Sequence, residues 1–176
     1  MAEAEKKETW IQWVALATTI LAVAAAISSL RASSYSTKVQ LSTTQEANKW
    51  GHYQAKAIRE HAYRLNKDML TTARMEAKAP QVITFLDERL KKYDQEIGRY
   101  SKEKEEIMAE ARAIQKEQEV FKQHNGAFAL AVMILQIAIM MNAVGALIRK
   151  KEMWYVGMAL GLVGMVYMAN GFFLFF

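Results

Sequence analysis

The sequence predicts an all-α membrane protein in which three transmembrane helices carry a long antiparallel coiled-coil hairpin between the first and second spans. Three observations predict this fold: three long segments without charge, a charged middle block with heptad periodicity, and a scarcity of residues that break helices. The 176 residues include one proline, eight glycines and no cysteine. Because so few positions favour turns, we expect long uninterrupted helices.

The charge-free segments are residues 10–30, 126–148 and 153–176. At a rise of about 1.5 Å per residue, each is long enough to cross a hydrocarbon core of about 30 Å. Three such segments in so short a chain argue against buried helices of a soluble core. The first could instead be a cleavable signal peptide, but its leader carries three glutamates against two lysines. Since signal peptides begin with net positive charge, we interpret it as a membrane anchor.

The short flanking segments predict the orientation. Residues 1–9 contain Lys6 and Lys7, and the loop of residues 149–152 contains three further basic residues. Because three spans put these two segments on the same side, the positive-inside rule places both in the cytoplasm. Residues 31–125 would then face the periplasm from a bacterial inner (plasma) membrane, or the outside in a cell with one membrane. Aromatic residues of the interfacial type lie at the cytoplasmic span ends: Trp10, Trp13, Trp154 and Tyr155.

The middle block contains two series of residues spaced alternately by three and four, which is the signature of a coiled coil. The second series is mainly apolar, with charges on the other faces. It consists of Ile83, Leu86, Leu90, Tyr93, Ile97, Tyr100, Lys104, Ile107, Ala111, Ile114, Gln118 and Phe121. The first series weakens towards the membrane and consists of Leu41, Thr44, Asn48, Gly51, Ala55, Ile58, Ala62, Leu65, Met69 and Thr72.

The chain is expected to reverse near Pro80, its only proline, which separates the two series. Proline disfavours helical geometry in the preceding residue and suits the first turn of a new helix. Folding the chain there predicts how the two series pair. The expected layers are Met69 with Leu90, Leu65 with Tyr93, Ala62 with Ile97, and Ile58 with Tyr100.

A short aromatic face lies beside the first series and includes Trp50, Tyr53 and Ala57. Large aromatic residues are favoured anchors between subunits, so these residues are candidate contacts in a homo-oligomer. The alternative is that they form the edge of the seam within one chain. Gly157 and Gly161 in the third span have the spacing that lets helix backbones approach in lipid. They are candidate oligomer contacts too, or they pack against another span of the same chain.

Four polar side chains lie in apolar surroundings and are expected to bond across helices rather than face lipid. They are Gln12, Gln136, Asn142 and Asn170. The spans contain no Asp, Glu, Lys, Arg or His, so the sequence lacks the usual signature of a proton relay or ion pathway.

No pattern in the sequence predicts catalysis. His52, His61 and His124 lack the spacing of metal ligands, and no glycine-rich phosphate loop or nucleophile motif is present. The net charge of +5 is spread over alternating charges without a basic patch interleaved with aromatics, which disfavours nucleic acid as a partner. We therefore expect neither enzymatic activity nor a cofactor or metal. The expected partners are membrane lipid, further copies of the chain and a larger membrane complex.

Residues 48–59 read Asn-Lys-Trp-Gly-His-Tyr-Gln-Ala-Lys-Ala-Ile-Arg and are followed by His61 and Tyr63. This stretch resembles the Trp…Tyr-Gln-Ala-Lys…Ile-Arg signature of a bacterial membrane-protein family described as domain of unknown function 4337. Residues 135–139 and 161–164 are similar to that family too. The resemblance implies a three-span membrane protein with a helical insert and brings no activity. It also implies roles beyond packing for Trp50, Tyr53, Gln54, Lys56 and Gln136.

Two functions fit these features. The first is a non-enzymatic scaffold or interaction protein, a homo-oligomer whose helical rods project from the inner membrane. The alternative is an oligomeric channel or transport component with a pore lined by Gln136, Asn142, or Thr18 and Thr19. The absence of charge within the spans counts against a channel, although hydrophobic gates exist. An accessory subunit of a larger complex is a variant of the first hypothesis.

Overall fold

The computed structural model describes residues 2–175, and it describes side chains from residue 10 onward. The described chain forms three helices, α1 (Ala2–Glu76), α2 (Pro80–Leu147) and α3 (Lys151–Phe173). The predicted all-α class is therefore confirmed. Three helices are also long and apolar enough to cross a membrane. The side chains of the predicted cytoplasmic N-terminus, residues 1–9, lie outside the described part, as does Phe176 at the end of the third predicted span.

The chain divides into two compact units. One contains residues up to Leu41 together with those from Gln118 onward, and the other is Ser42–Glu117. Both α1 and α2 contribute to each unit, whereas α3 belongs entirely to the first.

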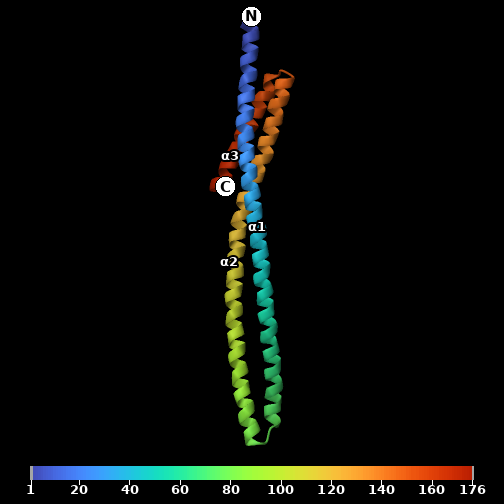
Figure 1. Cartoon of the computed structure of the whole chain (residues 1–176), viewed down its shortest axis with the longest axis vertical. Coiled ribbons are helices and arrows are strands. Elements are labelled where there is room, and N and C mark those ends of the chain that lie inside the picture. The colour runs from blue at the N-terminus through green and yellow to red at the C-terminus, as the bar shows by residue number, and fades with distance from the viewer. Residues whose placement is uncertain (1, 176) are drawn as a thin grey trace. The chain divides into compact units, whose positions relative to one another are not determined.

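The connection between α1 and α2 contains only three residues. α1 ends at Glu76 and α2 begins at Pro80, and the turn between them is coloured green in Figure 1. The carbonyl of Ala79 accepts the backbone N–H groups of Val82 and Ile83, each at 3.1 Å. Ala79 therefore caps α2, and proline occupies the first helical position, where a missing N–H costs no intrahelical hydrogen bond.

A tight turn also joins α2 to α3. Arg149 takes a left-handed conformation with φ of 56°, its N–H donates to Ala146, and the N–H of Lys150 donates to Gly145. This pair of hydrogen bonds is the Schellman arrangement that closes helices. A Cβ on Gly145 would lie 3.0 Å from the backbone nitrogen of Trp154, so glycine allows the two helix ends to approach. α3 then begins at Lys151, within the predicted loop.

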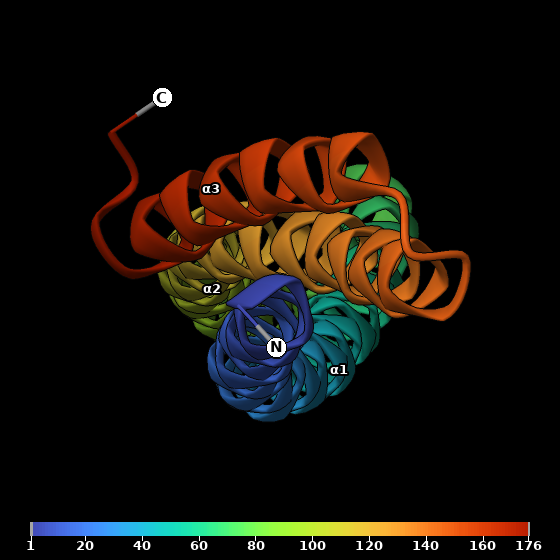
Figure 2. The ribbon, with the colours of Figure 1, turned by 90° about the horizontal axis from the view of Figure 1, so that it is seen from above.

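In the first unit, small residues let the three helices pack closely. The hydrophobic core consists of Leu21, Ala24, Ala25, Leu135 and Ala138. Figure 2 shows α3 running alongside the last part of α2. The buried face of α3 consists of Gly157, Gly161, Gly164, Asn170 and Gly171. α3 ends at Phe173, where Leu174 turns left-handed with φ of 49° and its N–H donates to the Asn170 carbonyl at 2.7 Å.

The second unit consists of two helical arms that lie side by side (Figure 1). We call the part of α1 from Ser42 to Glu76 the first arm, and the part of α2 from Pro80 to Glu117 the second arm. The arms run in opposite directions, because Arg74 at the end of the first pairs with Asp87 at the start of the second. Further along, Lys49 pairs with Glu110.

Candidate functional site

The inward face of the second arm follows the predicted series. Every predicted position from Ile83 to Ile114 is buried or half-buried. The most buried are Leu86, Tyr100, Ile107 and Ala111. The spacing of apolar residues therefore correctly predicted which face of the second arm packs inward.

The predicted inward face of the first arm is wrong. Every position of that series, from Leu41 to Thr72, is exposed. Ile58 is 70% exposed, Leu65 50% and Met69 71%. The layers that these residues were expected to form with the second arm are therefore absent, and the first arm is rotated so that a different face packs inward.

The face that packs inward is made of lysines, tyrosines and carboxylates, and we call it the lysine–tyrosine seam. Its members recur at spacings of three and four, and all are buried or half-buried. They are Glu46, Lys49, Tyr53, Lys56, Glu60, Tyr63, Lys67, Leu70 and Arg74. Long basic side chains can bury their carbon stems along apolar neighbours and carry their charges to the edge of the contact. A seam of this composition can therefore cover the apolar face of the second arm.

Five ion pairs join the seam to the second arm, and in four of them the first arm supplies the base and the second the acid. These four are Lys49–Glu110 at 2.5 Å, Lys56–Glu103 at 2.6 Å, Lys67–Asp94 at 2.6 Å and Arg74–Asp87 at 2.7 Å. Such partly exposed pairs contribute little stability individually. Together these four pairs favour the contact between these two faces, because a rotated arm would lose all four.

A buried network lies midway along the arms around Glu60, which is only 5% exposed. Its carboxylate receives Lys104 from the second arm and Arg64 from its own helix, each at 2.6 Å. The hydrogen bonds from Lys104 and Arg64 hold the pKa of Glu60 below its ordinary value. The Lys104 ammonium also lies 5.6 Å from the centre of the Tyr53 ring. The charged interruption in the predicted second series is thus the partner of this buried carboxylate.

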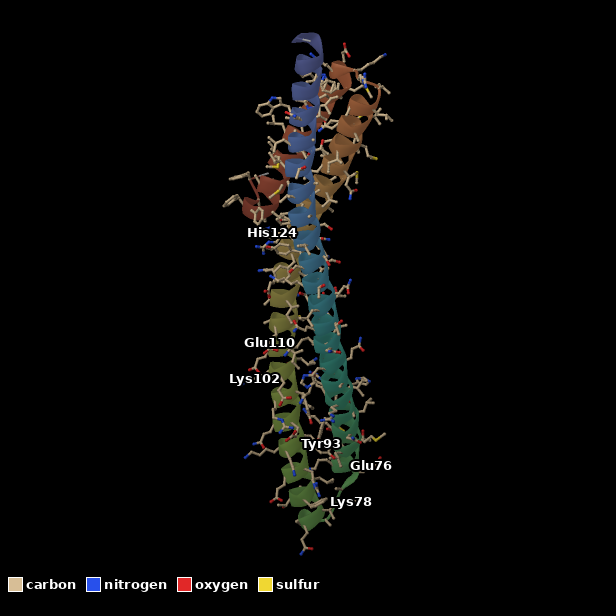
Figure 3. The ribbon with its side chains drawn as sticks, turned by 45° about the horizontal axis from the view of Figure 1, so that its top comes forward. Glu76, Lys78, Tyr93, Lys102, Glu110 and His124 are labelled. Carbon is tan, nitrogen blue, oxygen red and sulfur yellow. The ribbon has the colours of Figure 1, made fainter. Side chains whose placement is uncertain are left out.

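Tyrosines fill the adjacent layers. The Tyr63 ring lies 5.4 Å from that of Tyr93 and 5.6 Å from that of Tyr100, measured between centroids. Figure 3 shows Tyr93 between the two arms. The Lys56 ammonium lies 5.4 Å from the centre of the Tyr100 ring. Lys56 also donates a hydrogen bond to Glu103, and this bond is the main reason that the pKa of Glu103 is lowered. Cation–π contacts therefore accompany the ion pairs.

The aromatic face predicted as an oligomer contact belongs partly to this seam. Tyr53 is a seam residue, and Trp50 stands edge-on to it with ring centroids 5.6 Å apart. The Trp50 indole N–H donates to Glu46 at 3.3 Å. Trp50 and Ala57 are half-buried beside the seam. Tyr53 therefore takes part in the contact between the arms, whereas Trp50 contacts Glu46 and Tyr53 of its own helix.

The two candidate glycines of α3 contact other helices of the same chain. A Cβ on Gly161 would lie 2.8 Å from the Leu21 side chain, and one on Gly157 would meet the Asn142 side chain. These close approaches correspond to the alternative given for the glycine spacing, which is packing against another span of the same chain.

The four polar residues of the predicted spans fall into two groups. Gln12 and Gln136 are exposed, whereas Asn142 and Asn170 are buried. Within the described residues, neither polar atom of the Asn142 side chain has a hydrogen-bond partner. The expected bond across helices is therefore missing at Asn142, whose amide packs against Gly157 instead.

Sequence reasoning missed an aromatic cluster in the first unit. The rings of Tyr35 and His124 stack with centroids 4.6 Å apart, and the Phe128 ring also stacks with that of Tyr35, with centroids 6.0 Å apart. His124 Nδ1 donates to the carbonyl of Gly171 at 2.7 Å, which ties α2 to the end of α3. His52 and His61 are exposed. Among the described side chains, no three His, Cys, Asp or Glu residues gather closely enough to hold a metal ion.

The fold and the seam together define an all-α protein with three helices able to cross a membrane and a pair of ion-paired helical arms. The chain belongs to the family described as domain of unknown function 4337, whose model matches residues 10–174. The resemblance seen in the sequence is thereby confirmed. No curated protein and no solved structure matches the chain.

Proposed function

We propose that this protein is a non-enzymatic membrane scaffold. Its three apolar segments anchor it in a bacterial inner membrane, its two arms form an antiparallel coiled coil outside the hydrocarbon, and copies of the chain associate.

The observation that carries this proposal is that charged residues of the second unit form ion pairs between the two arms. Enzymes direct titratable groups into a concave site and shift their pKa values there. Here the buried carboxylate Glu60 is paired with Lys104, and the lowered pKa of Glu103 follows from its pair with Lys56. The same groups that could serve chemistry instead align two helices. This is the arrangement expected of a structural or interaction module.

Contacts at one end of the first unit support the proposed orientation. Trp10 of α1 stacks on Trp154 of α3 with ring centroids 6.2 Å apart and planes within 10°. The start of the first apolar segment therefore lies beside the α2–α3 turn, which carries Arg149, Lys150 and Lys151. Tryptophans are typical of either membrane interface, and basic residues in a short loop are typical of its cytoplasmic side. The N-terminus would be cytoplasmic and residues 31–125 periplasmic.

The exposed amide of Gln136 supports self-association. This side chain lies on the surface of α2 within an apolar segment. In hydrocarbon a glutamine gains by hydrogen bonding across helices, and double-mutant measurements in membranes average about 0.6 kcal/mol for such bonds. A second copy of the chain would supply an identical partner.

Native mass spectrometry of the full chain in lipid nanodiscs tests the proposal. We expect a homo-oligomer, and Gln136→Leu should shift it towards smaller species while helix content stays unchanged. A strictly monomeric wild-type chain would remove the proposal. Orientation is tested separately: a reporter that is active only in the periplasm should give signal when inserted at Pro80 and none at Lys151. The reverse pattern would overturn the orientation alone.

A channel is the second candidate, favoured by a groove of about 410 Å³ between α1 and α2 that Thr18 and Thr19 help to line. Both hydroxyls donate to carbonyls of their own helix, Thr18 to Val14 and Thr19 to Ala15, which leaves them less able to coordinate an ion. Of the other two expected pore residues, Asn142 is buried against α3, whereas Gln136 is exposed. The test is ion flux from proteoliposomes that contain the protein. Flux with the wild type that is lost in Thr18→Val would favour the channel.

A further inference from the structure

The rotation of the first arm leaves an uncharged, heptad-spaced face pointing outward, and we call it the outer stripe. It consists of Thr44, Asn48, Gly51, Ala55, Ile58, Ala62, Leu65, Met69 and Thr72, all of them exposed. A heptad repeat of mainly small and apolar residues is the pattern of a helix that packs along its length on another helix. In the described chain the second arm packs on the lysine–tyrosine seam and not on this stripe.

The outer stripe differs from the rest of the surface of the arms. The exposed positions of the second arm are dense in charge, and include Glu88, Lys91, Lys92, Lys102, Glu105 and Arg112. Depletion of charge at the centre of a patch is the compositional mark of a protein interface. On the first arm the stripe carries no charge, and most of the exposed positions beside it carry none either.

We propose that the outer stripe packs in parallel against the outer stripe of a second copy of this chain. This inference rests on the membrane scaffold proposed above. Copies anchored in one membrane share an orientation, so a pair is related by a twofold axis along the membrane normal. Each stripe residue then meets its own counterpart, as in a parallel two-stranded coiled coil.

Like residues meet acceptably in every layer of such a pair. Asn48 would face Asn48 of the second copy, where two amides can bond to each other; a single Asn at this kind of heptad position specifies register in parallel pairs. Gly51, Ala55 and Ala62 would allow close approach of the backbones. Ile58 and Leu65 would supply the apolar contact that their exposure leaves unused.

The residues beside the stripe are compatible with the same pairing. In a parallel pair, each residue on one edge meets the residue five positions later on the other copy. Gln54 would meet Arg59, and Asp68 would meet Ala73, so no like charges are opposed. The lysine–tyrosine seam could not pair with itself in this way, because Lys49, Lys56 and Lys67 would each face an identical charge.

The size of the contact fits a modest dimer. The stripe and its two edges, residues 45, 47, 52, 54, 59, 61, 66, 68 and 73, present about 18 residues a side, against roughly 20–30 in stable interfaces. Confinement to a membrane raises the effective concentration of one copy around another, which favours association of modest surfaces.

Cysteine trapping tests the contact directly, since the chain contains no cysteine. Single variants Ala55→Cys and Ala62→Cys are placed in the full chain in native membranes, with Lys102→Cys on the charged surface of the second arm as the control. Under mild oxidation we expect disulfide-linked dimers to form at least tenfold faster at positions 55 and 62 than at 102. Adding Ile58→Lys and Leu65→Lys to Ala62→Cys should reduce the dimer at least fivefold. Both side chains are exposed in one chain, so folding should be unaffected.

The outcomes separate this inference from the scaffold itself. Equal trapping at all three positions, or none at 55 and 62 while native mass spectrometry shows an oligomer, would overturn the stripe contact and leave the scaffold standing. A monomeric chain in both experiments would overturn both. Trapping at 55 and 62 that survives the two lysine substitutions would also contradict the proposed packing.

Discussion

Glu60 occupies an environment unlike that of a solvated helix face. Its carboxylate is almost completely buried, and two cations hold it from different helices. Burying a charge is unfavourable unless it is paired, and removing one partner of such a pair is more damaging than replacing both. The contribution of Glu60 therefore depends on its ionisation.

Protonation of Glu60 should weaken the pairing of the arms. Because its pKa is lowered in the folded chain, the stabilisation is fully present above the ordinary glutamate value of about 4.3 and is lost as the pH falls through the lower folded value. Glu60→Gln should destabilise the arms by about 2 kcal/mol at pH 7, a typical value for a hydrogen bond to a charged group. Thermal unfolding followed by circular dichroism between pH 7 and pH 3 measures both effects.

The control for this experiment is Glu105→Gln, which removes an exposed carboxylate outside the network. The control should keep the acid sensitivity of the wild type, whereas Glu60→Gln should flatten it. Equal acid sensitivity in all three proteins would show that ionisation of Glu60 does not support the fold.

At the scale of the helices, the choice of face in the first arm shows what apolar periodicity can and cannot predict. The arm carries two heptad series on different faces. Apolar periodicity predicts that the apolar series packs inward, whereas the structure packs the lysine–tyrosine seam inward. Matching each lysine to a carboxylate across the turn, as in Lys67 with Asp94, was the signal that could have identified the other face. Hydrophobic pattern favours burial in general, but complementary charge decides which of two competing faces meets a particular partner.

Packing of α3 depends on the absence of a side chain at Gly157. A Cβ there would meet the Asn142 side chain and lie 3.1 Å from the Ala138 carbonyl oxygen. Overpacking of a tight contact typically costs about 1–3 kcal/mol. Gly157→Ala should therefore destabilise the first unit, as measured by unfolding of the full chain in mixed detergent micelles.

Gly126→Ala is the matched control, because nothing lies within 4 Å of the Cβ that it would add. Alanine favours a helix over glycine by about 1 kcal/mol, so this variant should be as stable as the wild type or more so. If Gly157→Ala were as stable as Gly126→Ala, close packing of α3 on α2 would be refuted.

At the scale of the whole chain, each of the two units is stabilised by its own kind of packing. The first unit joins apolar helices through glycine and alanine, and the second joins charged arms through ion pairs and tyrosines. The sequence predicted the helical class and the apolar segments, since length and composition determine these. It did not predict the seam or the Tyr35–His124 stack, because both depend on which side chains meet across helices distant in sequence.

The central claim is that the first arm turns its lysine–tyrosine seam, and not its apolar face, towards the second arm. Disulfide trapping within one chain tests it with two double variants that share a partner: Tyr63→Cys with Tyr93→Cys, and Leu65→Cys with Tyr93→Cys. Mass spectrometry of the linked peptides counts the bonds formed within monomers. We expect the 63/93 pair to close at least tenfold faster than the 65/93 pair, because the Tyr63 and Tyr93 rings are in contact and Leu65 points outward. Faster closure of 65/93 would contradict the assigned rotation.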